Sequence, residues 1–151
     1  MKLNEKPKIL AWPATHYVFI EKKGPFHKTA PLAWGKLHQA VPNILENNRI
    51  TGYLAMYKAE AGVYRAGVSL SAPGRKLPAG FKSTKFKGGK YSCFVLKGPY
   101  SDLPEACGRV FEIVEKKPIK MRKDFCIEHY KTDPRVTPED KTVTEILIPT
   151  A

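Results

Sequence analysis

Glu128 is the residue whose type and position most suggest chemistry. It lies in the apolar segment Phe125-Cys-Ile-Glu-His-Tyr130, which we expect to be a strand. Strand alternation puts Glu128 and Tyr130 on one face and His129 on the other. A buried carboxylate is costly unless it is paired, and a cationic ligand could supply the pair. The alternative is an acid on a solvated strand face, and the spacing leaves both open.

Aromatic side chains are plentiful and could surround such a carboxylate. The candidates for a binding site are Trp34, Tyr53 and Phe94. Trp34 stands one residue off the apolar stripe of its expected helix, so it could face a site instead of the core. Aromatic rings around an acid make a suitable site for a flat cation. Ordinary core packing is the alternative for each ring taken alone.

Most known catalytic and metal-binding motifs are absent. The sequence has no HExxH, CxxC, P-loop, GxSxG or GxGxxG pattern, and its four histidines lack metal-ligand spacing. We therefore expect no metal and no cofactor. The three cysteines are odd in number, which favours reduced thiols in a cytoplasmic protein. No apolar run approaches 18 residues and the N-terminus does not resemble a secretory signal, so we expect no membrane association.

The charge is high for a chain of 151 residues. Lysine and arginine number 26 against 14 acids, a net charge of +12. This raises the hypothesis of a nucleic-acid or anionic partner, but scattered lysines favour a merely soluble surface. Residues 72–89 are predicted to be a basic, solvated connection. No base-reading groups accompany its lysines, so we expect no sequence-specific nucleic-acid binding.

An internal repeat organises the elements that must position these side chains. Residues 17–26 align without a gap to residues 91–100, and Gly24-Pro25 matches Gly98-Pro99. A fixed period indicates two copies of one unit, which must bury their apolar faces on each other. Ligand sites tend to form at such a seam.

Each copy is predicted to be strand, helix, strand, strand. The expected strands are 14–23, 52–58 and 63–71 in the first copy, and 90–97, 124–131 and 142–149 in the second. Thr29 is the expected N-cap of the first helix, Pro42 should kink or interrupt that helix, and Asn47-Asn48 should end it. Ser101 or Asp102 should cap the second helix. The fold class is therefore α+β: a single domain over 1–151, with antiparallel sheet, one main helix per half, and repeats at about 14–71 and 90–149.

Several short motifs resemble one known family. The stretch Glu128-His-Tyr130-Lys-Thr-Asp133-Pro134 and the closing segment Thr144-Glu-Ile-Leu-Ile-Pro149 are the most specific. Together with Gly89-Lys-Tyr91 and Lys97-Gly-Pro-Tyr100, they are similar to the GyrI-like small-molecule-binding domain of the AraC-type effector-binding superfamily. The resemblance spans about residues 14–149. It implies a ligand pocket between the halves, with Glu128 as the acidic ligand residue and Tyr130 beside it.

The resemblance leaves three functions open. The leading interpretation is a stand-alone binder of aromatic or cationic small molecules, using Glu128 and Tyr130 with Trp34, Tyr53 and Phe94. The first alternative is a hydrolase of cyclopropane-bearing electrophilic natural products, with Glu128 as its catalytic base. The second is a protein-interaction module that modulates DNA gyrase, which we favour least.

Overall fold

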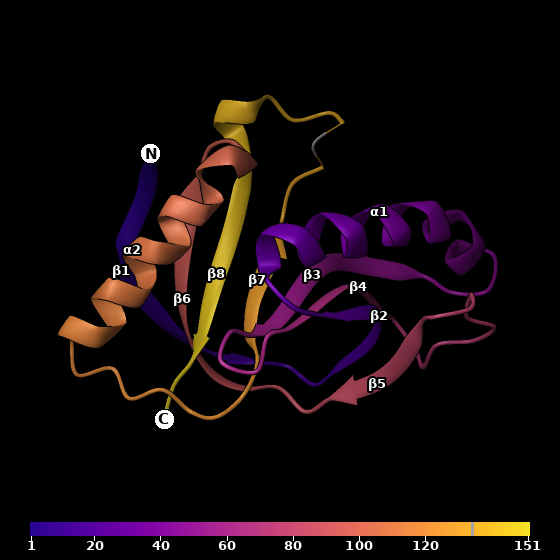
Figure 1. The fold of residues 1–151 in the computed structure, drawn as a ribbon, viewed down its shortest axis with the longest axis horizontal. Helices are drawn as coiled ribbons and strands as arrows, with labels where there is room; N and C mark the ends of the chain where they lie inside the picture. The colour runs from indigo at the N-terminus through magenta and orange to yellow at the C-terminus, as the bar shows by residue number, and fades with distance from the viewer. Residues whose placement is uncertain (134) are drawn as a thin grey trace. The chain divides into compact units, whose positions relative to one another are not determined.

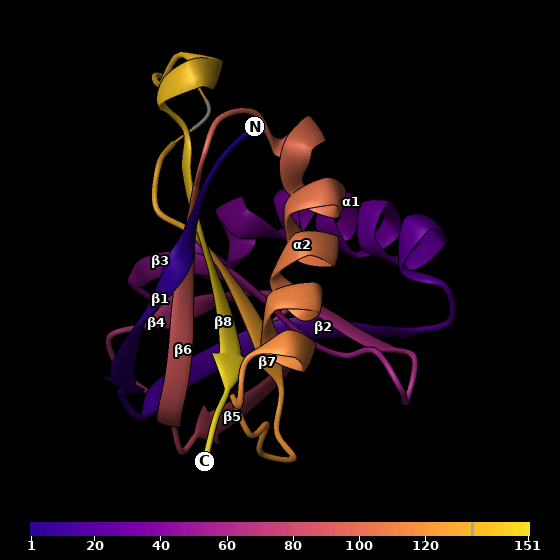
Figure 2. The ribbon, with the colours of Figure 1, turned by 90° about the vertical axis from the view of Figure 1, so that its left-hand side faces the viewer.

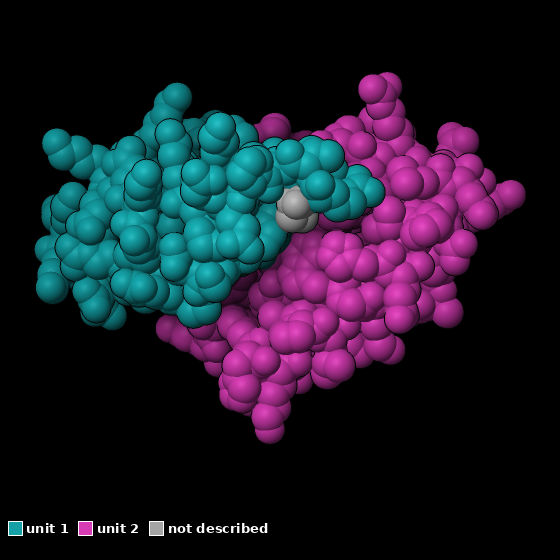
Figure 3. Space-filling view, turned by 90° about the horizontal axis from the view of Figure 1, so that it is seen from above, with its two compact units in different colours: residues 1–12, 89–151 teal, residues 13–88 magenta. Residues whose placement is uncertain are grey.

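Two sets of strands, each with one helix, make up this computed structural model, which describes residues 1–133 and 135–151 (Figure 1). Unit 1 comprises residues 1–12 and 89–151, and unit 2 comprises residues 13–88 (Figure 3). The first predicted repeat therefore lies in unit 2 and the second in unit 1. Pro134, at the end of the most specific motif, lies outside the described residues.

Unit 2 is an antiparallel sheet with one long helix. Its elements are β2 (Thr15–Lys23), α1 (Phe26–Leu45), β3 (Ile50–Lys58), β4 (Val63–Leu70) and β5 (Lys82–Phe86). The strand order is β3-β4-β2-β5. Ala33, Leu37 and Ile44 recur at helical spacing along α1 and are fully buried, so this stripe holds the helix against β2 and β4.

Unit 1 has the same kind of sheet and a shorter helix. Its elements are β1 (Lys2–Trp12), β6 (Gly89–Lys97), α2 (Leu103–Lys116), β7 (Cys126–Tyr130) and β8 (Val143–Pro149), with 3-10 turns at Tyr100–Asp102 and Glu139–Lys141. The strand order is β1-β6-β8-β7. Figure 2 shows α2 running alongside β6 and β8. Its buried residues Ala106, Val110 and Val114 recur every four positions and so lie on one face of the helix.

The two Gly-Pro turns confirm the predicted duplication. Gly24 and Gly98 have φ values of 127° and 135°, a region that favours glycine. Each glycine N–H donates to a carbonyl of its own unit at 2.9 Å, that of Gly62 and of Thr142 respectively. In both units a strand, a helix and two further strands follow in the same order. The predicted α+β class, with antiparallel strands and one main helix per repeat, is confirmed.

Two strands were not predicted, and both lie at a sheet edge. The segment 72–89 was expected to be a loop, but β5 occupies 82–86 and pairs with β2. Residues 2–12 were given no structure, but β1 pairs with β6. Both segments carry lysines instead of alternating apolar residues, so they lack the period-two signal of a half-buried strand.

These edge strands are exchanged with respect to the repeats. β1 precedes the first repeat but pairs with β6 of the second, and β5 precedes the second repeat but pairs with β2 of the first. Each unit thus takes its fourth strand from the segment that leads into the other repeat.

The first helix begins earlier than predicted and ends at Leu45, close to the expected end at Asn47-Asn48. Thr29 is not the N-cap: α1 begins at Phe26, directly after Pro25, and the Thr29 hydroxyl donates to the Pro25 carbonyl at 3.2 Å. Pro42 does not interrupt the helix, which continues to Leu45. Proline removes one hydrogen bond near this end, and burial of Ile44 continues the packed face beyond it. None of the helices in the described residues is long and apolar enough to cross a membrane.

Candidate ligand-binding site

Glu128 is buried and held at both carboxylate oxygens. Its side chain projects from β7, and the residue is 8% exposed. The Tyr130 hydroxyl donates to Oε1 at 2.7 Å, and the Cys107 thiol of α2 donates to Oε2 at 3.4 Å. The solvated alternative for Glu128 is therefore wrong, and Tyr130 lies on the same face as predicted.

Tyr100 adds a second ring to this group. Its ring meets that of Tyr130 edge to face, with 5.6 Å between centroids, and it remains 38% exposed. Burial, together with the nearby Asp133 carboxylate, raises the pKa of the Tyr100 phenol, so it stays neutral at physiological pH. Glu128 thus accepts a hydrogen bond from the half-buried Tyr130, whose ring contacts the more exposed Tyr100.

Sequence reasoning missed Tyr100 and Cys107 as members of this site. Tyr100 lies directly after the Gly98-Pro99 turn, and Cys107 lies on α2. A signal for Tyr100 was present, because the repeat matches it to Phe26. Cys107 could be found only by knowing which turn of α2 crosses β7.

Phe94 lies on the same face of the unit 1 sheet but in the core. It pairs with Ile146 of β8, which pairs in turn with Glu128, and directly paired residues project to the same side. Phe94 is fully buried. Its ring therefore supports the site from within and offers no open surface to a ligand.

Trp34 and Tyr53 belong to unit 2. The Trp34 indole N–H donates to the Tyr64 hydroxyl at 2.7 Å, and Tyr53 is half-buried on β3. Phe26 approaches Tyr64 at 5.4 Å and Tyr57 at 5.7 Å between ring centroids, which completes an aromatic cluster. The structure brings Glu128, Tyr130 and Phe94 to one face of unit 1. That Trp34 and Tyr53 join them stays a prediction.

The opposite face of unit 1 carries a second carboxylate. His129 Nδ1 lies 2.8 Å from Glu145 Oε1, and the Trp12 ring meets His129 at 5.3 Å. The Cys93 thiol lies 3.5 Å from Glu145 Oε2; burial and this carboxylate raise the pKa of Cys93 to about 12. Cys93 is therefore no nucleophile at neutral pH. In residues 1–133 and 135–151, no cluster of histidine, cysteine and acidic side chains could hold a metal ion.

Comparison with known proteins identifies the fold. Residues 5–151 match the GyrI-like small molecule binding domain. A search of curated proteins gives no match.

Three solved structures illustrate the likeness. The EcmrR C-terminal domain is 16% identical in sequence, with a TM-score of 0.78. The alignment covers 100% of this chain and 99% of the EcmrR domain. SAV2435 bound to tetraphenylphosphonium is 15% identical with a TM-score of 0.69, covering 96% and 93%. A hydrolase from Listeria innocua is 12% identical with a TM-score of 0.63, covering 98% and 93%. At these identities the likeness shows the fold alone.

Proposed function

This chain belongs to the GyrI-like small molecule binding domain family, and on that premise we propose that it binds aromatic cations at the Glu128 carboxylate. The observation that carries the proposal is the burial of this carboxylate beside two phenol rings. A buried carboxylate attracts a cation strongly because little water screens it, and phenol rings favour a flat or aryl-bearing cation.

A structural neighbour supports this ligand class. SAV2435 was solved with tetraphenylphosphonium, a cation whose charge is surrounded by four phenyl rings. Such an ion gains from aromatic contact and needs no hydrogen bond, so a carboxylate occupied by the Tyr130 hydroxyl and the Cys107 thiol can still stabilise it. Tetraphenylphosphonium is therefore the first probe to test on this chain.

The test compares two carboxylates on opposite faces of one sheet, the buried Glu128 and the half-buried Glu145. Glu128→Gln keeps the side-chain shape and removes the charge, and Glu145→Gln does the same on the other face. Calorimetric titration with tetraphenylphosphonium should show roughly ten- to hundredfold weaker binding for Glu128→Gln, as expected for loss of a charge-assisted contact. Glu145→Gln should bind within about twofold of wild type. Equal affinity in wild type and Glu128→Gln would refute the proposal.

A neutral ligand of similar shape sharpens the assignment. Triphenylphosphine oxide offers the rings without the charge. If charge drives recognition, it should bind more weakly than tetraphenylphosphonium and be insensitive to Glu128→Gln. Melting curves of each variant check that the fold is intact, because a ligand that binds only the folded state raises the melting temperature.

Hydrolysis of a strained electrophile is a second candidate. The observation that favours it is the 2.7 Å contact between the Tyr130 hydroxyl and Glu128, an acid beside a base. Glu128 would take a proton from water as its oxygen attacks the cyclopropane carbon. The released carbon–carbon electron pair would pass into a conjugated carbonyl, and a tyrosine hydroxyl would supply the final proton. Glu128→Gln should then abolish turnover of a cyclopropanoid while binding persists; no turnover by wild type would exclude this candidate.

We also propose a cytoplasmic location. No disulfide joins Cys93, Cys107 or Cys126 in the described residues, as suits a reducing compartment. Cell fractionation with a periplasmic marker tests this.

A further inference from the structure

Positive charge is divided unequally between the two units. Unit 2 carries twelve lysine and arginine residues and three glutamates, whereas unit 1 carries fourteen cations and eleven acids. In unit 1 acids lie beside cations, as in the pairs Arg109–Glu5 at 2.7 Å and Arg122–Asp124 at 2.7 Å. In unit 2, Arg65 Nε forms a salt bridge with Glu21 Oε1 at 2.8 Å. Apart from this pair, the unit contains two glutamates and eleven lysine or arginine residues. Most of the excess charge therefore belongs to unit 2.

Five of these cations form what we call the basic strip. Its members are Arg75, Lys76, Lys82, Lys85 and Lys87, all exposed. Between residues 61 and 101 the sequence contains no aspartate or glutamate. The strand β5, at the edge of the unit 2 sheet, carries Lys82 and Lys85 (Figure 1). A Cβ on Gly74 would lie 3.1 Å from Ser83 Oγ, so the turn that carries Arg75 runs beside β5.

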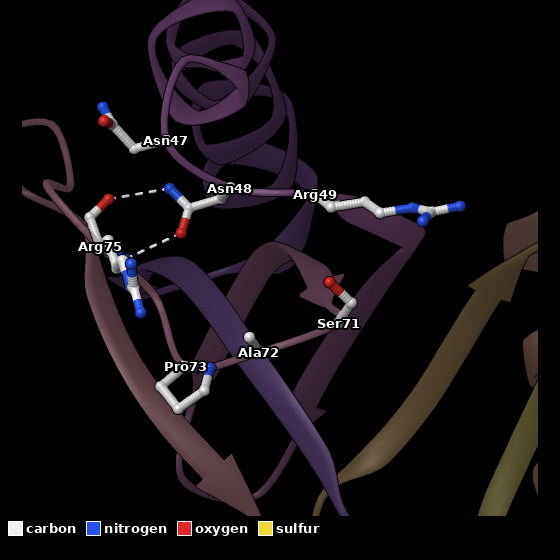
Figure 4. Close-up of a pocket in the computed structure, with 7 residues that line it drawn as sticks. All are labelled: Asn47, Asn48, Arg49, Ser71, Ala72, Pro73 and Arg75. Carbon is white, nitrogen blue, oxygen red and sulfur yellow. Dashed lines mark hydrogen bonds between the residues drawn. The ribbon is translucent and has the colours of Figure 1, made fainter.

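The turn at Arg75 is held in place. Asn48 Nδ2 donates to the Arg75 carbonyl at 2.8 Å, and the Arg75 N–H donates to Asn48 Oδ1 at 2.8 Å (Figure 4). Within the described part of the chain, Lys76 is the non-glycine residue with positive φ, at 49°. This conformation is uncommon outside glycine and needs support from the surroundings. A hollow of about 310 Å³, lined in part by Arg49, Ser71 and Arg75, opens beside this turn.

We propose that the basic strip binds the phosphate backbone of nucleic acid without regard to sequence. Charge supplies nearly all of the affinity in such binding, and the side chains of arginine, lysine, serine and threonine are its usual donors. Ser83 and Thr84 stand exposed between Lys82 and Lys85 and add two hydroxyls. The strip presents no arrangement of base-reading side chains, which agrees with the expected lack of sequence specificity.

Two other anionic partners fit the strip less well. Docking to an acidic membrane usually adds inserted apolar groups, and none of the large hydrophobic side chains exposed in the described residues lies within 72–88. A protein partner needs a buried anchor, usually aromatic, at the centre of its interface. The strip offers cations and hydroxyls alone, which suits a uniform polyanion.

The test uses two triple variants of equal charge. Lys82→Gln/Lys85→Gln/Lys87→Gln removes three cations from the strip. Lys116→Gln/Lys117→Gln/Lys120→Gln removes three exposed cations from unit 1. Fluorescence anisotropy with a labelled 20-base-pair duplex, titrated at several salt concentrations, compares them with wild type. Melting curves confirm that both variants fold.

The strip variant should bind at least tenfold more weakly at low salt. The slope of log affinity against log salt should fall by about 2.7 if three phosphate contacts are lost. The unit 1 variant should change affinity less than threefold, and a shuffled duplex should bind like the original.

Four results would overturn the proposal. They are absence of binding at low salt, equal losses in the two variants, a strong preference for one duplex sequence, and equal or tighter binding to polyglutamate or to anionic lipid vesicles. None of these bears on the Glu128 site, so the two proposals stand or fall separately.

Discussion

The two units share a backbone plan and differ at one position that matters for chemistry. Ile20 and Phe94 occupy matched positions in the two repeats. In unit 2, Ile20 pairs with Ala66, which pairs with Ala55 on the next strand. In unit 1, Phe94 pairs with Ile146, which pairs with Glu128 on the next strand. Ala55 is fully buried and apolar, while Glu128 is a buried acid. The duplicated backbone thus tolerates either residue, which suggests that the acid in unit 1 is not required by the fold.

A second difference lies one strand away. The matched residues Phe19 and Cys93 pair with Gly67 in unit 2 and with Leu147 in unit 1, respectively. A Cβ on Gly67 would lie 2.5 Å from the Tyr17 ring, so glycine makes room for this tyrosine. Leucine fills the same place in unit 1.

The matched tyrosines consequently find different partners. The Tyr17 hydroxyl donates to the carbonyl of Leu54, the residue that pairs with Gly67, at 3.0 Å. The Tyr91 hydroxyl donates instead to the Phe125 carbonyl at 2.8 Å, just before β7. Repeats that keep their backbone can therefore repack their cores independently, one small-for-large exchange at a time.

The largest expected effect concerns the cysteines, all of which lie in unit 1. Burial, with Glu128 and Asp124 nearby, raises the pKa of Cys126 to about 12, and burial with Glu145 does the same for Cys93. At pH 8 their thiolate fractions should be about a thousandfold below that of an ordinary thiol. Alkylation followed by mass spectrometry should label Cys107 first, and tetraphenylphosphonium should slow that labelling. Labelling of Cys126 as fast as that of Cys107 in native protein would contradict this expectation.

Next in size is a substitution at the glycine that distinguishes unit 2. Gly67→Ala should lower the free energy of unfolding by about 3 kcal/mol, because the new Cβ meets both the Tyr17 ring and the Val18 carbonyl at 2.5 Å. Gly35→Ala is the control: nothing lies within 4 Å of its Cβ, so it should be neutral or stabilising by up to about 1 kcal/mol. Denaturant titration measures both. Equal stability of wild type and Gly67→Ala would mean that the Tyr17 ring can move aside.

Removing the hydroxyl of either matched tyrosine should lower the free energy of unfolding by a smaller amount, equal in the two units. Tyr17→Phe and Tyr91→Phe each remove one hydroxyl that donates to a backbone carbonyl. Each should cost about 1 kcal/mol of unfolding free energy, the usual net contribution of such a bond. Thermal and denaturant melts of the two variants, and of the double variant, test whether the units contribute alike. A much larger loss of unfolding free energy in one variant would show that the two hydroxyls do not contribute equally to stability.

The smallest effect concerns the exposed pair Glu5–Arg109 of unit 1. The hydrogen bond from Arg109 lowers the pKa of the Glu5 carboxyl. A depressed carboxyl pKa stabilises the fold above the ordinary value of about 4.3 and loses that contribution as the pH falls through the folded value. Glu5→Gln should therefore melt slightly below wild type at pH 7 and together with it near pH 3. A difference in melting temperature between wild type and Glu5→Gln that grows as the pH falls would contradict this expectation.

The sequence predicted the elements whose signals are local. Gly24-Pro25 and Gly98-Pro99 mark each turn because glycine permits a positive φ and proline holds φ negative. The apolar stripe of α2 has a clear helical period. Pro42 was misjudged because one lost hydrogen bond weighs less than continued burial of the helix face.

The misses concern long-range contacts. Lysine-rich edge strands carry no alternation, so β1 and β5 are visible only through their pairing partners. Cys107 of α2 contacts the Glu128 carboxylate, and no local pattern indicates which helix residue will face it. The role of Glu128 in binding stays a prediction, and so does the contribution of Trp34 and Tyr53.

The exchange of edge strands determines the order in which the two units can complete their sheets during synthesis. Unit 2 is continuous in the chain and can close as soon as residue 88 is available, whereas β1 must wait for partners made 77 to 95 residues later, from Gly89 to Lys97. At ribosomal speeds this is a delay of roughly 4–20 seconds. A waiting strand risks pairing with other chains. Pro7, where the register shifts between Asn4 and Lys8, and the lysines around it leave β1 poorly suited to premature pairing.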